Sequence, residues 1–401
     1  MSTMWSAVLP LVLVYLQTAT AVYLPILTKF TPLVNLTLVR DNAVAISNRS
    51  WEVGTLAEAL LELEHPVYAI FGNNSVPPVL PTNRLNVSEP TDVLRIANTT
   101  VSEKPSSSRV LIAGDGAVGD PASIGPAVLF ANWTLSEPAY ASAATEQLEY
   151  ILNDAPRAPS GAISHRADEV QLWADFIYMA PPFIAYYGAL QNNVTLLRTA
   201  YEQISLYRDA LYDADAGLWR HVALGTWQDT NHWGTGNGWA AAGMLRVIAS
   251  MNASASSAEL TWERGNLTEW VGEILAGVWA HQLTNGTLLN YIDQTPPATF
   301  ADTSSTALLA AASYRHAVLT NTTTHIPAAE AAYALIQASV DTDGWLQNTV
   351  DPMLFDVPSA TGAHSPEGQS FVMLLEAART AWNATGAAAE GTALERRAYS
   401  A

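Results

Sequence analysis

An aspartate lies inside an aromatic and apolar segment near the middle of the chain. Asp175 has Trp173 two residues before it, and Phe176 and Tyr178 shortly after it. The spacing of the apolar residues predicts one helix over residues 169–189, with the aspartate in its interior. A carboxylate in these surroundings is either held by hydrogen bonds or has a pKa raised by desolvation, which suits a catalytic acid. The simpler alternative is a structural aspartate that bonds a neighbouring loop.

Other carboxylates have simpler explanations. Asp120 precedes Pro121 and Asp302 precedes Thr303, so each can serve as the N-cap of a helix. Asp175 is predicted to lie where no cap is needed, so it is the strongest catalytic candidate. The remaining acidic candidates are Asp115, Asp168, Glu169, Asp229 and Glu367.

Four predicted loops share a glycine that is followed four residues later by a polar side chain. The glycines are Gly161, Gly217, Gly286 and Gly344, and the polar residues are His165, His221, Asn290 and Asn348. Their spacing of roughly 56–69 residues is that of a helical hairpin with its loop. In a ring of such hairpins the four polar side chains would approach one mouth. We expect His165 and His221 to be functional there, with ordinary turn residues as the alternative.

From residue 120 onward the chain is predicted to be almost entirely helical. The expected helices cover residues 121–132, 139–153, 169–189, 194–212, 237–251, 267–282, 304–319, 327–340 and 366–381. Their number and spacing, close to about twelve helices in all, predict an all-α fold, an (α/α)6 barrel of six helical hairpins. An open α-solenoid is the alternative.

The start of the chain is predicted to differ from the barrel. Residues 1–21 combine a short apolar run with a small-x-small end, as in a secretory signal peptide. Residues 22–115 form an N-terminal lead-in, and residues 116–401 form the main part of a single catalytic domain. The chain is therefore predicted to be secreted and extracellular.

Within the lead-in, local patterns predict four features. Weak alternation over residues 33–39 indicates a short β-rich start, and residues 51–64 form the first clear helix. Residues 72–108 are rich in Pro, Asn and Ser, which is typical of a long irregular loop. A further strand is predicted over residues 107–112.

Acceptor sites for N-linked glycans support secretion. Composition alone would yield about a third of the Asn-x-Ser/Thr sequons that occur. The sequon asparagines are Asn35, Asn48, Asn73, Asn86, Asn98, Asn132, Asn193, Asn252, Asn266, Asn285, Asn321 and Asn383. We expect a eukaryotic glycoprotein.

Composition excludes several functional classes. The formal net charge is −19, which argues against nucleic-acid binding. Hydrophobic residues make up 49% of the chain and charged residues 14%, as in a folded domain with a large core. The chain has no cysteine, so disulfides and thiolate metal sites are impossible. No segment after the leader is long and apolar enough for a membrane span, and no membrane partner is expected.

Familiar catalytic motifs do not occur, but aromatic residues are abundant. The sequence has no nucleophile elbow, no phosphate-binding Gly-x-x-x-x-Gly-Lys loop and no His-Glu-x-x-His zinc helix. The chain has 13 tryptophans, many of them beside the repeated loops. Each can be a platform on which a sugar stacks or simply part of the core. The candidates are Trp219, Trp227, Trp233, Trp239 and Trp345.

Several of these motifs together resemble a known enzyme family. The helix from Trp173 to Phe183, the Gly217–His221 loop and the Trp233–Trp239 segment occur in the order found in unsaturated uronyl hydrolases. Asp302 with its Thr/Ser-rich continuation and the Ser365–Gly368 loop resemble further motifs of that family. The resemblance covers about residues 120–379 and is to the unsaturated rhamnogalacturonyl and glucuronyl hydrolases of glycoside hydrolase families 105 and 88, in a secreted, fungal-type form. It also implies the six-hairpin fold.

The resemblance implies a reaction and roles for individual residues. Enzymes of this family hydrate the C4=C5 double bond of an unsaturated uronic acid at the end of an oligosaccharide. Asp175 would protonate C4 and activate the water, and Asp120 would be the second acidic residue, with Asp115 as its competitor. The oligosaccharide would be bound by His221, Trp233, Asn237, Trp239, His165, Tyr178 and Trp219. No metal or organic cofactor is implied.

One position departs from the family pattern. The family has an arginine where this chain has Thr235, and a hydroxyl does not replace a bidentate contact to the substrate carboxylate. Either His221, His232 or Arg220 takes its place, or the substrate differs. Two alternatives stay open: a conventional hydrolase of saturated uronosides that uses Asp175 and Asp120, and a secreted glycan-binding barrel without catalysis.

Overall fold

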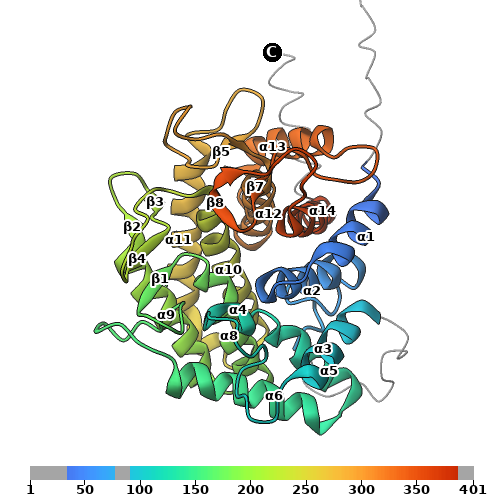
Figure 1. Ribbon diagram of the computed structural model, residues 1–401, viewed down its shortest axis with the longest axis vertical. Helices are drawn as coiled ribbons and strands as arrows, with labels where there is room; N and C mark the ends of the chain where they lie inside the picture. Colours follow the sequence, from blue (N-terminus) through green and yellow to red (C-terminus); the bar gives the residue numbers. More distant parts are fainter. Residues whose placement is uncertain (1–33, 77–90, 387–401) are drawn as a thin grey trace, which may run out of the picture. The chain divides into compact units, whose positions relative to one another are not determined.

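In the computed structural model, which describes residues 34–76 and 91–386, six helices line the inside of a ring. They are α2 (Ser50–Glu64), α5 (Gly125–Leu135), α8 (Pro181–Leu190), α10 (Gly234–Ala253), α12 (Thr303–Thr320) and α14 (Pro366–Ala384). Each inner helix contacts the next, and α14 packs against α2, so the ring is closed (Figure 1).

Six outer helices alternate with the inner ones along the chain. They are α1 (Leu36–Ile46), α3 (Thr91–Glu103), α6 (Pro138–Glu149), α9 (Val194–Leu211), α11 (Thr261–Trp279) and α13 (Ile326–Ser339). Short turns complete the described helices: α4 (Gly119–Ala122), α7 (Phe176–Met179), a π-turn at Tyr150–Asp154 and a 3-10 turn at Ser257–Leu260. The predicted (α/α)6 barrel is thus confirmed, and closure of the ring rules out the open solenoid.

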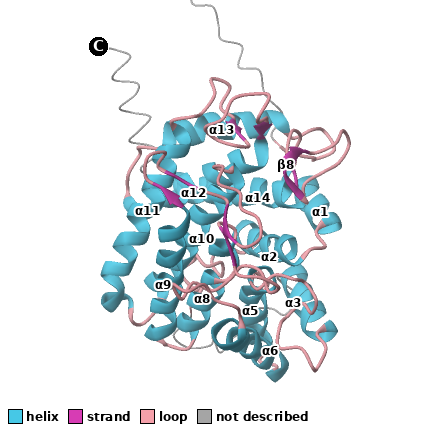
Figure 2. Cartoon of the chain, turned by 60° about the vertical axis from the view of Figure 1, so that its left-hand side comes forward, coloured by secondary structure: helices cyan, strands magenta, loops and turns pink. Residues whose placement is uncertain are grey.

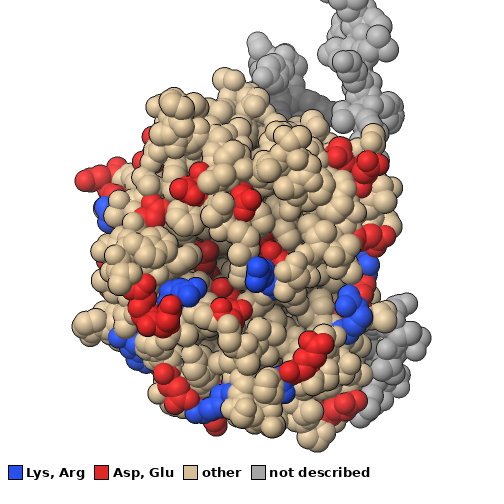
Figure 3. Space-filling view, in the orientation of Figure 1, with Lys and Arg blue, Asp and Glu red and all other residues tan. Residues whose placement is uncertain are grey.

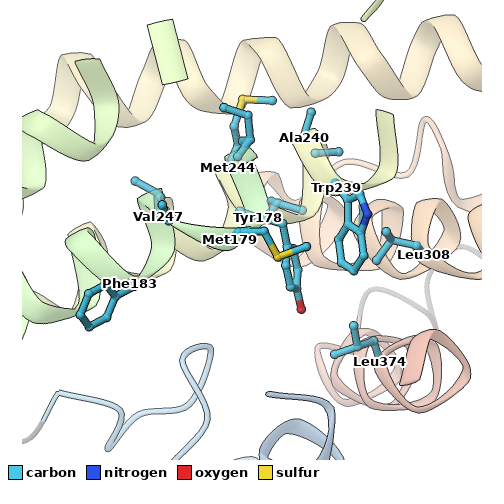
Figure 4. Packing of buried hydrophobic residues seen from close by; sticks show 14 of the residues in the cluster. Tyr178, Met179, Phe183, Trp239, Ala240, Met244, Val247, Leu308 and Leu374 are labelled. Carbon is cyan, nitrogen blue, oxygen red and sulfur yellow. The ribbon is translucent and has the colours of Figure 1, made fainter. Parts of the chain in front are cut away.

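The core lies inside the ring because the inner helices are apolar or small on nearly every side. Helix α12 buries 14 of its 18 residues, whereas the outer α13 buries 3 of its 14. A helix without a polar face must be surrounded by protein. Figure 4 shows how the inner helices meet: Trp239 of α10 lies beside Tyr178, with Leu308 of α12 and Leu374 of α14 facing them.

Short antiparallel strand pairs lie in the loops between helices (Figure 2). The pairs are β1 (Gln171–Trp173) with β4 (Val222–Leu224), β2 (Tyr212–Asp213) with β3 (Leu218–Trp219), β5 (Leu288–Leu289) with β6 (Ala301–Asp302), and β7 (Val350–Asp351) with β8 (Leu354–Pro358). The four repeated glycines all have positive φ, from 68° at Gly217 to 96° at Gly161. Side chains other than glycine rarely adopt this backbone, which explains why the repeat begins with glycine.

The predicted helix over residues 169–189 was wrong in its first half. Residues 171–173 form β1, which pairs with β4, and helix α7 begins only after Asp175. Pro181 then starts a separate helix, because proline cannot donate within a helix interior. Asp175 is therefore at the start of a short helix rather than inside a long one.

Predictions for the lead-in were also partly wrong. The alternation over residues 33–39 gives way to helix α1, whose N-cap Asn35 accepts bonds from two backbone amides. The predicted loop over residues 72–108 contains α3, whose buried residues recur at helical spacing, and residues 107–112 form turns and bends instead of a strand. The predicted signal peptide at residues 1–21 lies outside the described residues, as does Asn86. No described helix is both long and apolar enough to cross a bilayer.

Candidate active site

All six inner helices begin at the same end of the barrel, and side chains from the first turns of α2, α10, α12 and α14 lie at the candidate site there. A pocket with about 380 Å³ of empty space is lined by Asp175, Trp233, Thr235, Trp239, Ser304, Phe355, Glu367 and their neighbours. Trp51 of α2 donates from its indole to Glu367 of α14, and Asp120 enters from α4. Helix N-termini carry partial positive charge, so this end of the ring favours anions. Acidic and basic side chains border a hollow on the corresponding face (Figure 3).

Asp175 is held beside His221 by the pairing of two strands. Trp173 of β1 pairs with Val222 of β4, and the amide of Ala174 donates to the carbonyl of His221. The Asp175 Oδ2 atom lies 3.5 Å from Nε2 of His221. Both atoms are buried and have no closer hydrogen-bond partner among the described residues, so both are available to a ligand in the pocket.

The other nitrogen of His221 contacts a second carboxylate. Nδ1 lies 3.0 Å from Oδ2 of Asp229, which also accepts a bond from the Tyr291 hydroxyl at 3.1 Å. Asn231 donates both its backbone and side-chain N–H groups to the other oxygen of Asp229. The imidazole is therefore fixed in orientation, with one nitrogen facing each carboxylate.

Asp120 and His165 form a second Asp–His pair at the same mouth. An isolated β-bridge joins Ala117 to Arg166, and the amide of Val118 donates to the carbonyl of His165. The Nε2 atom of His165 then lies 3.5 Å from Oδ1 of Asp120. Asp120 is the second residue of α4, so it is not the N-cap that the sequence suggested. Asp302, by contrast, does cap α12.

The pKa values of the two pairs are shifted in opposite directions. Burial alone would raise the pKa of Asp175, but His221 and His165 lower that pKa below the ordinary value. Burial alone would lower the pKa of His221, but Asp175 and Asp229 raise it. The pKa of Asp120 is raised well above its ordinary value by burial and by the charges of Asp115 and Asp175. Burial lowers the pKa of His165 to about 4.

The pKa expected for Asp175 was therefore wrong in direction. Desolvation was expected to raise the pKa of Asp175, and the protonated His221 next to it reverses the effect. These shifts favour a carboxylate with an imidazolium in one pair, and a neutral acid with a neutral imidazole in the other. This difference could not be read from the sequence, because it depends on which side chains touch His221.

Aromatic rings enclose the ionised pair. The imidazole of His221 lies 4.5 Å from the ring centres of both Trp233 and Phe355, and 5.3 Å from that of Trp173. Trp227 is 42% exposed and stacks parallel to Phe355. Trp233 and Trp239 line the pocket. Both were predicted to contact the sugar, and that contact stays a prediction. Trp345 instead stacks on His364 at 3.9 Å.

Three predicted substrate contacts lie behind the pocket wall. Trp219 is completely buried, and Asn237 bonds the backbone of Trp219 and the carbonyl of Trp233. Tyr178 packs under Trp239 and its ring faces Arg246 at 5.0 Å. These positions suit residues that hold the wall in place, and contact with a substrate at them stays a prediction.

Glu367 was noted in the sequence only as one of several carboxylates, but it lines the pocket. Burial raises the pKa of Glu367 to about 8, with a further contribution from Glu52. Its oxygens accept bonds from Trp51 and from the Ser365 hydroxyl. Asp115, the competitor of Asp120, is held by the Ser50 hydroxyl. A long-range contact such as Trp51 to Glu367 leaves no signal in local sequence.

The position of the missing arginine is occupied by an unpaired hydroxyl. Thr235 is 4% exposed, lines the pocket, and its Oγ1 has no hydrogen-bond partner among the described residues. Two proposed substitutes already face carboxylates: Arg220 contacts Asp213, and His232 lies 2.7 Å from Asp293. Arg166, which no sequence motif indicated, is a further candidate for contact with the substrate carboxylate.

Arg166 is the arginine whose charge acts on the second pair. Its charge opposes the upward shift in the pKa of Asp120, and it adds to burial in lowering the pKa of His165. Among the described residues, Asp168 is the carboxylate that pairs with the Arg166 guanidinium, at 3.2 Å. The Asp168 side chain is 68% exposed. Within residues 34–76 and 91–386, no three His, Cys, Asp or Glu side chains gather as metal ligands.

Comparison with known proteins shows which family the chain resembles in sequence. The sequence profile described as Glycosyl Hydrolase Family 88 matches residues 119–354. The chain is 30% identical over 139 residues to the unsaturated rhamnogalacturonyl hydrolase YesR of Bacillus subtilis, an alignment that spans 31% of this chain and 39% of that enzyme.

Solved structures share the fold at low identity. A possible member of family GH105 from Salmonella enterica serovar Paratyphi A matches with a TM-score of 0.68 at 18% identity, over 86% of this chain and 92% of its own. A family 88 glycosyl hydrolase from Bacteroides vulgatus matches with a TM-score of 0.64 at 16% identity, over 86% and 98%. The profile match covers more than half of the chain, and the protein is therefore a glycoside hydrolase that belongs to glycosyl hydrolase family 88.

Proposed function

We propose that this protein hydrates the C4=C5 double bond of an unsaturated uronic acid at the end of a pectin- or rhamnogalacturonan-type oligosaccharide. The observation that carries the proposal is the Asp175–His221 pair, whose aspartate lines a pocket together with residues from the first turns of α10, α12 and α14. The similarity to an unsaturated rhamnogalacturonyl hydrolase supports the same substrate class.

The ionised pair holds one proton, as the reaction requires. The proton of the pair moves from Nε2 of His221 through the Asp175 carboxylate to C4, and Asp175 then takes a proton from the water that attacks C5 and returns it to His221. The pair thus ends with the proton count it began with. The hydrated sugar is a hemiketal, which opens and releases the rest of the oligosaccharide. Asp229 stabilises the imidazolium and fixes its orientation, as a buried carboxylate does beside a catalytic histidine.

The site accepts an anionic sugar although the protein is acidic. Burial raises the pKa of Asp120 well above its ordinary value and that of Glu367 to about 8, which disfavours a negative charge at both. The helix N-termini add partial positive charge. Thr235 offers an unpaired hydroxyl, and Arg166 supplies a cation for the substrate carboxylate in place of the family arginine. Trp233 and Trp239 form the walls on which the sugar packs.

Secretion is part of the proposal, and its support is the sequon pattern. Of the described sequon asparagines none is buried, and most are exposed. Glycans at a surface asparagine increase solubility and require passage through a eukaryotic secretory route.

Absorbance at the unsaturated-uronide band tests the reaction. Lyase-generated pectin and glycosaminoglycan oligosaccharides are incubated with wild type, Asp175→Asn, and the exposed control Asp215→Asn. We expect wild type and the control to remove the band, and Asp175→Asn to be slower by about 10²–10⁴-fold, the usual contribution of acid–base catalysis. Equal rates for Asp175→Asn and wild type would overturn the role of Asp175.

One observation favours a second candidate function. Asp120 and Asp175 have pKa values shifted in opposite directions, as in an acid–base pair of a conventional glycosidase. Release of sugar from saturated uronosides, with no loss of the double-bond band on any unsaturated substrate, would establish this alternative and reject hydration.

A further inference from the structure

The end of the barrel opposite the pocket carries an apolar groove. It has about 1060 Å³ of empty space and lies between the C-terminal parts of α10 and α12 and the segment after α2. Val318 and Leu319 on its wall are 39% and 37% exposed. Phe71 lies opposite, under the guanidinium of Arg315 at 4.4 Å. The lining combines these apolar side chains with the polar groups of Asn73, Asn252 and Arg315, a combination that suits the C–H faces and hydroxyl groups of a sugar.

Sequons mark the C-terminal ends of the inner helices. Asn132, Asn252 and Asn383 lie in the last turn of α5, α10 and α14, and Asn321 is the C-cap of α12. Asn193 follows α8 by three residues, and Asn73 follows α2 by nine. All six inner helices therefore end near an acceptor site, on the end of the ring that faces away from the pocket.

Two of these asparagines line the groove itself. Asn73 and Asn252 are both exposed and both form part of its wall, and Asn321 lies two residues after Leu319. Arg264 contacts the Oδ1 atom of Asn252, which leaves the Nδ2 atom, the attachment point of a glycan, outside this contact.

We propose that N-linked glycans on Asn73 and Asn252 cover this groove, as part of a ring of glycans on the end of the barrel that faces away from the catalytic pocket. The inference rests on the secretory route proposed above and is independent of the reaction. The C–H faces of the first sugars pack on Phe71, Val318 and Leu319, and their hydroxyl groups face water. The substrate entrance stays clear of these glycans because all six acceptors lie at the opposite helix ends.

The test uses the full chain secreted from a eukaryotic host. Enzymatic release of glycans in heavy-oxygen water, followed by peptide mass spectrometry, measures occupancy at each asparagine. The double variant Asn73→Gln/Asn252→Gln is compared with Asn132→Gln/Asn383→Gln, which removes two acceptors from the same end outside the groove. Binding of an apolar fluorescent dye and sedimentation velocity report exposure of the groove. Wild type trimmed with a glycosidase under native conditions tests the same point without a substitution.

We expect glycans to occupy Asn73 and Asn252 in wild type. Dye fluorescence should rise severalfold, with or without self-association, only for Asn73→Gln/Asn252→Gln and for the trimmed wild type. Three results would overturn the proposal: secreted protein with Asn73 and Asn252 unmodified, equal behaviour of the two double variants, or wild type that already pairs with a second copy through this groove. Loss of the uronide band, measured on the same samples, reports the proposed reaction separately.

Discussion

The two Asp–His pairs at the mouth of the barrel are built alike and are charged differently. In each, a histidine four residues after a positive-φ glycine meets an aspartate at the start of an inner hairpin. In each, a β-bridge or strand pairing sets the two loops side by side, and the nearest N–O distance is 3.5 Å. Only in the pair of Asp175 and His221 do the pKa shifts favour the ionised forms.

The difference in pKa shifts comes from Nδ1 of each imidazole, the nitrogen that faces away from the paired aspartate. Nδ1 of His221 lies against Asp229, whereas the buried Nδ1 of His165 has no hydrogen-bond partner among the described residues. A second carboxylate compensates the cost of burying an imidazolium, and without it burial keeps the ring neutral. One contact outside the reacting pair thus decides which aspartate carries a negative charge.

Removing that contact should make the ionised pair resemble the neutral one. In Asp229→Asn the pKa of His221 falls and that of Asp175 rises, so we expect kcat/KM to drop by about 10²-fold. The high-pH limb of activity should move to lower pH by about one to three units, since a neighbouring charge has an effect of that size. A pH–rate series checks both. An unshifted high-pH limb would mean that Asp229 does not control the charge of His221.

The cation beside the neutral pair should affect binding more than chemistry. We expect Arg166→Gln to raise KM by about 10–100-fold, because a charge-assisted hydrogen bond contributes about 1.5–3 kcal/mol, while the pH limbs set by the other pair stay in place. Arg220→Gln is the matched control, since Arg220 already faces Asp213. Equal KM values for Arg166→Gln and wild type would exclude Arg166 as the carboxylate ligand.

Wild type should lose activity at both low and high pH. The pKa of His221 is raised, so the pair keeps its proton below that pKa and loses it as the pH rises through it. The pKa of Asp175 is lowered, so the carboxylate is present above that pKa and lost as the pH falls through it. Initial rates against pH should give a bell, and a flat profile through the neutral and alkaline range would contradict the proton relay.

The smallest effect should come from the neutral histidine. His165→Gln removes an imidazole whose pKa is low, so we expect kcat/KM to change by less than about tenfold and the high-pH limb to stay where it is. The low-pH limb should move slightly to higher pH, because His165 also lowers the pKa of Asp175. His221→Gln, assayed beside it, should lose activity to the extent of Asp175→Asn. If the two glutamine variants behaved alike, the distinction between the pairs would fail.

Local sequence patterns predicted the barrel fold and several residues of the candidate site. The helical periods, their spacing and the repeated glycines predicted the (α/α)6 ring, because each of these signals is set within one hairpin. Aromatic surroundings and motif order indicated Asp175, and the glycine repeat indicated His165 and His221. The errors lay where a segment is short: the strand at residues 171–173 and helix α1 are held by partners elsewhere in the chain.

Only the tertiary structure decided the charges and the positions. The sequence could not pair His221 with Asp229, Trp51 with Glu367, or leave the Thr235 hydroxyl open to the pocket. It could not show that Trp219 and Asn237 lie behind the wall, because burial depends on how six helices close into a ring. Desolvation and pairing act through space within a few ångströms, and folding sets those distances between residues far apart in the chain.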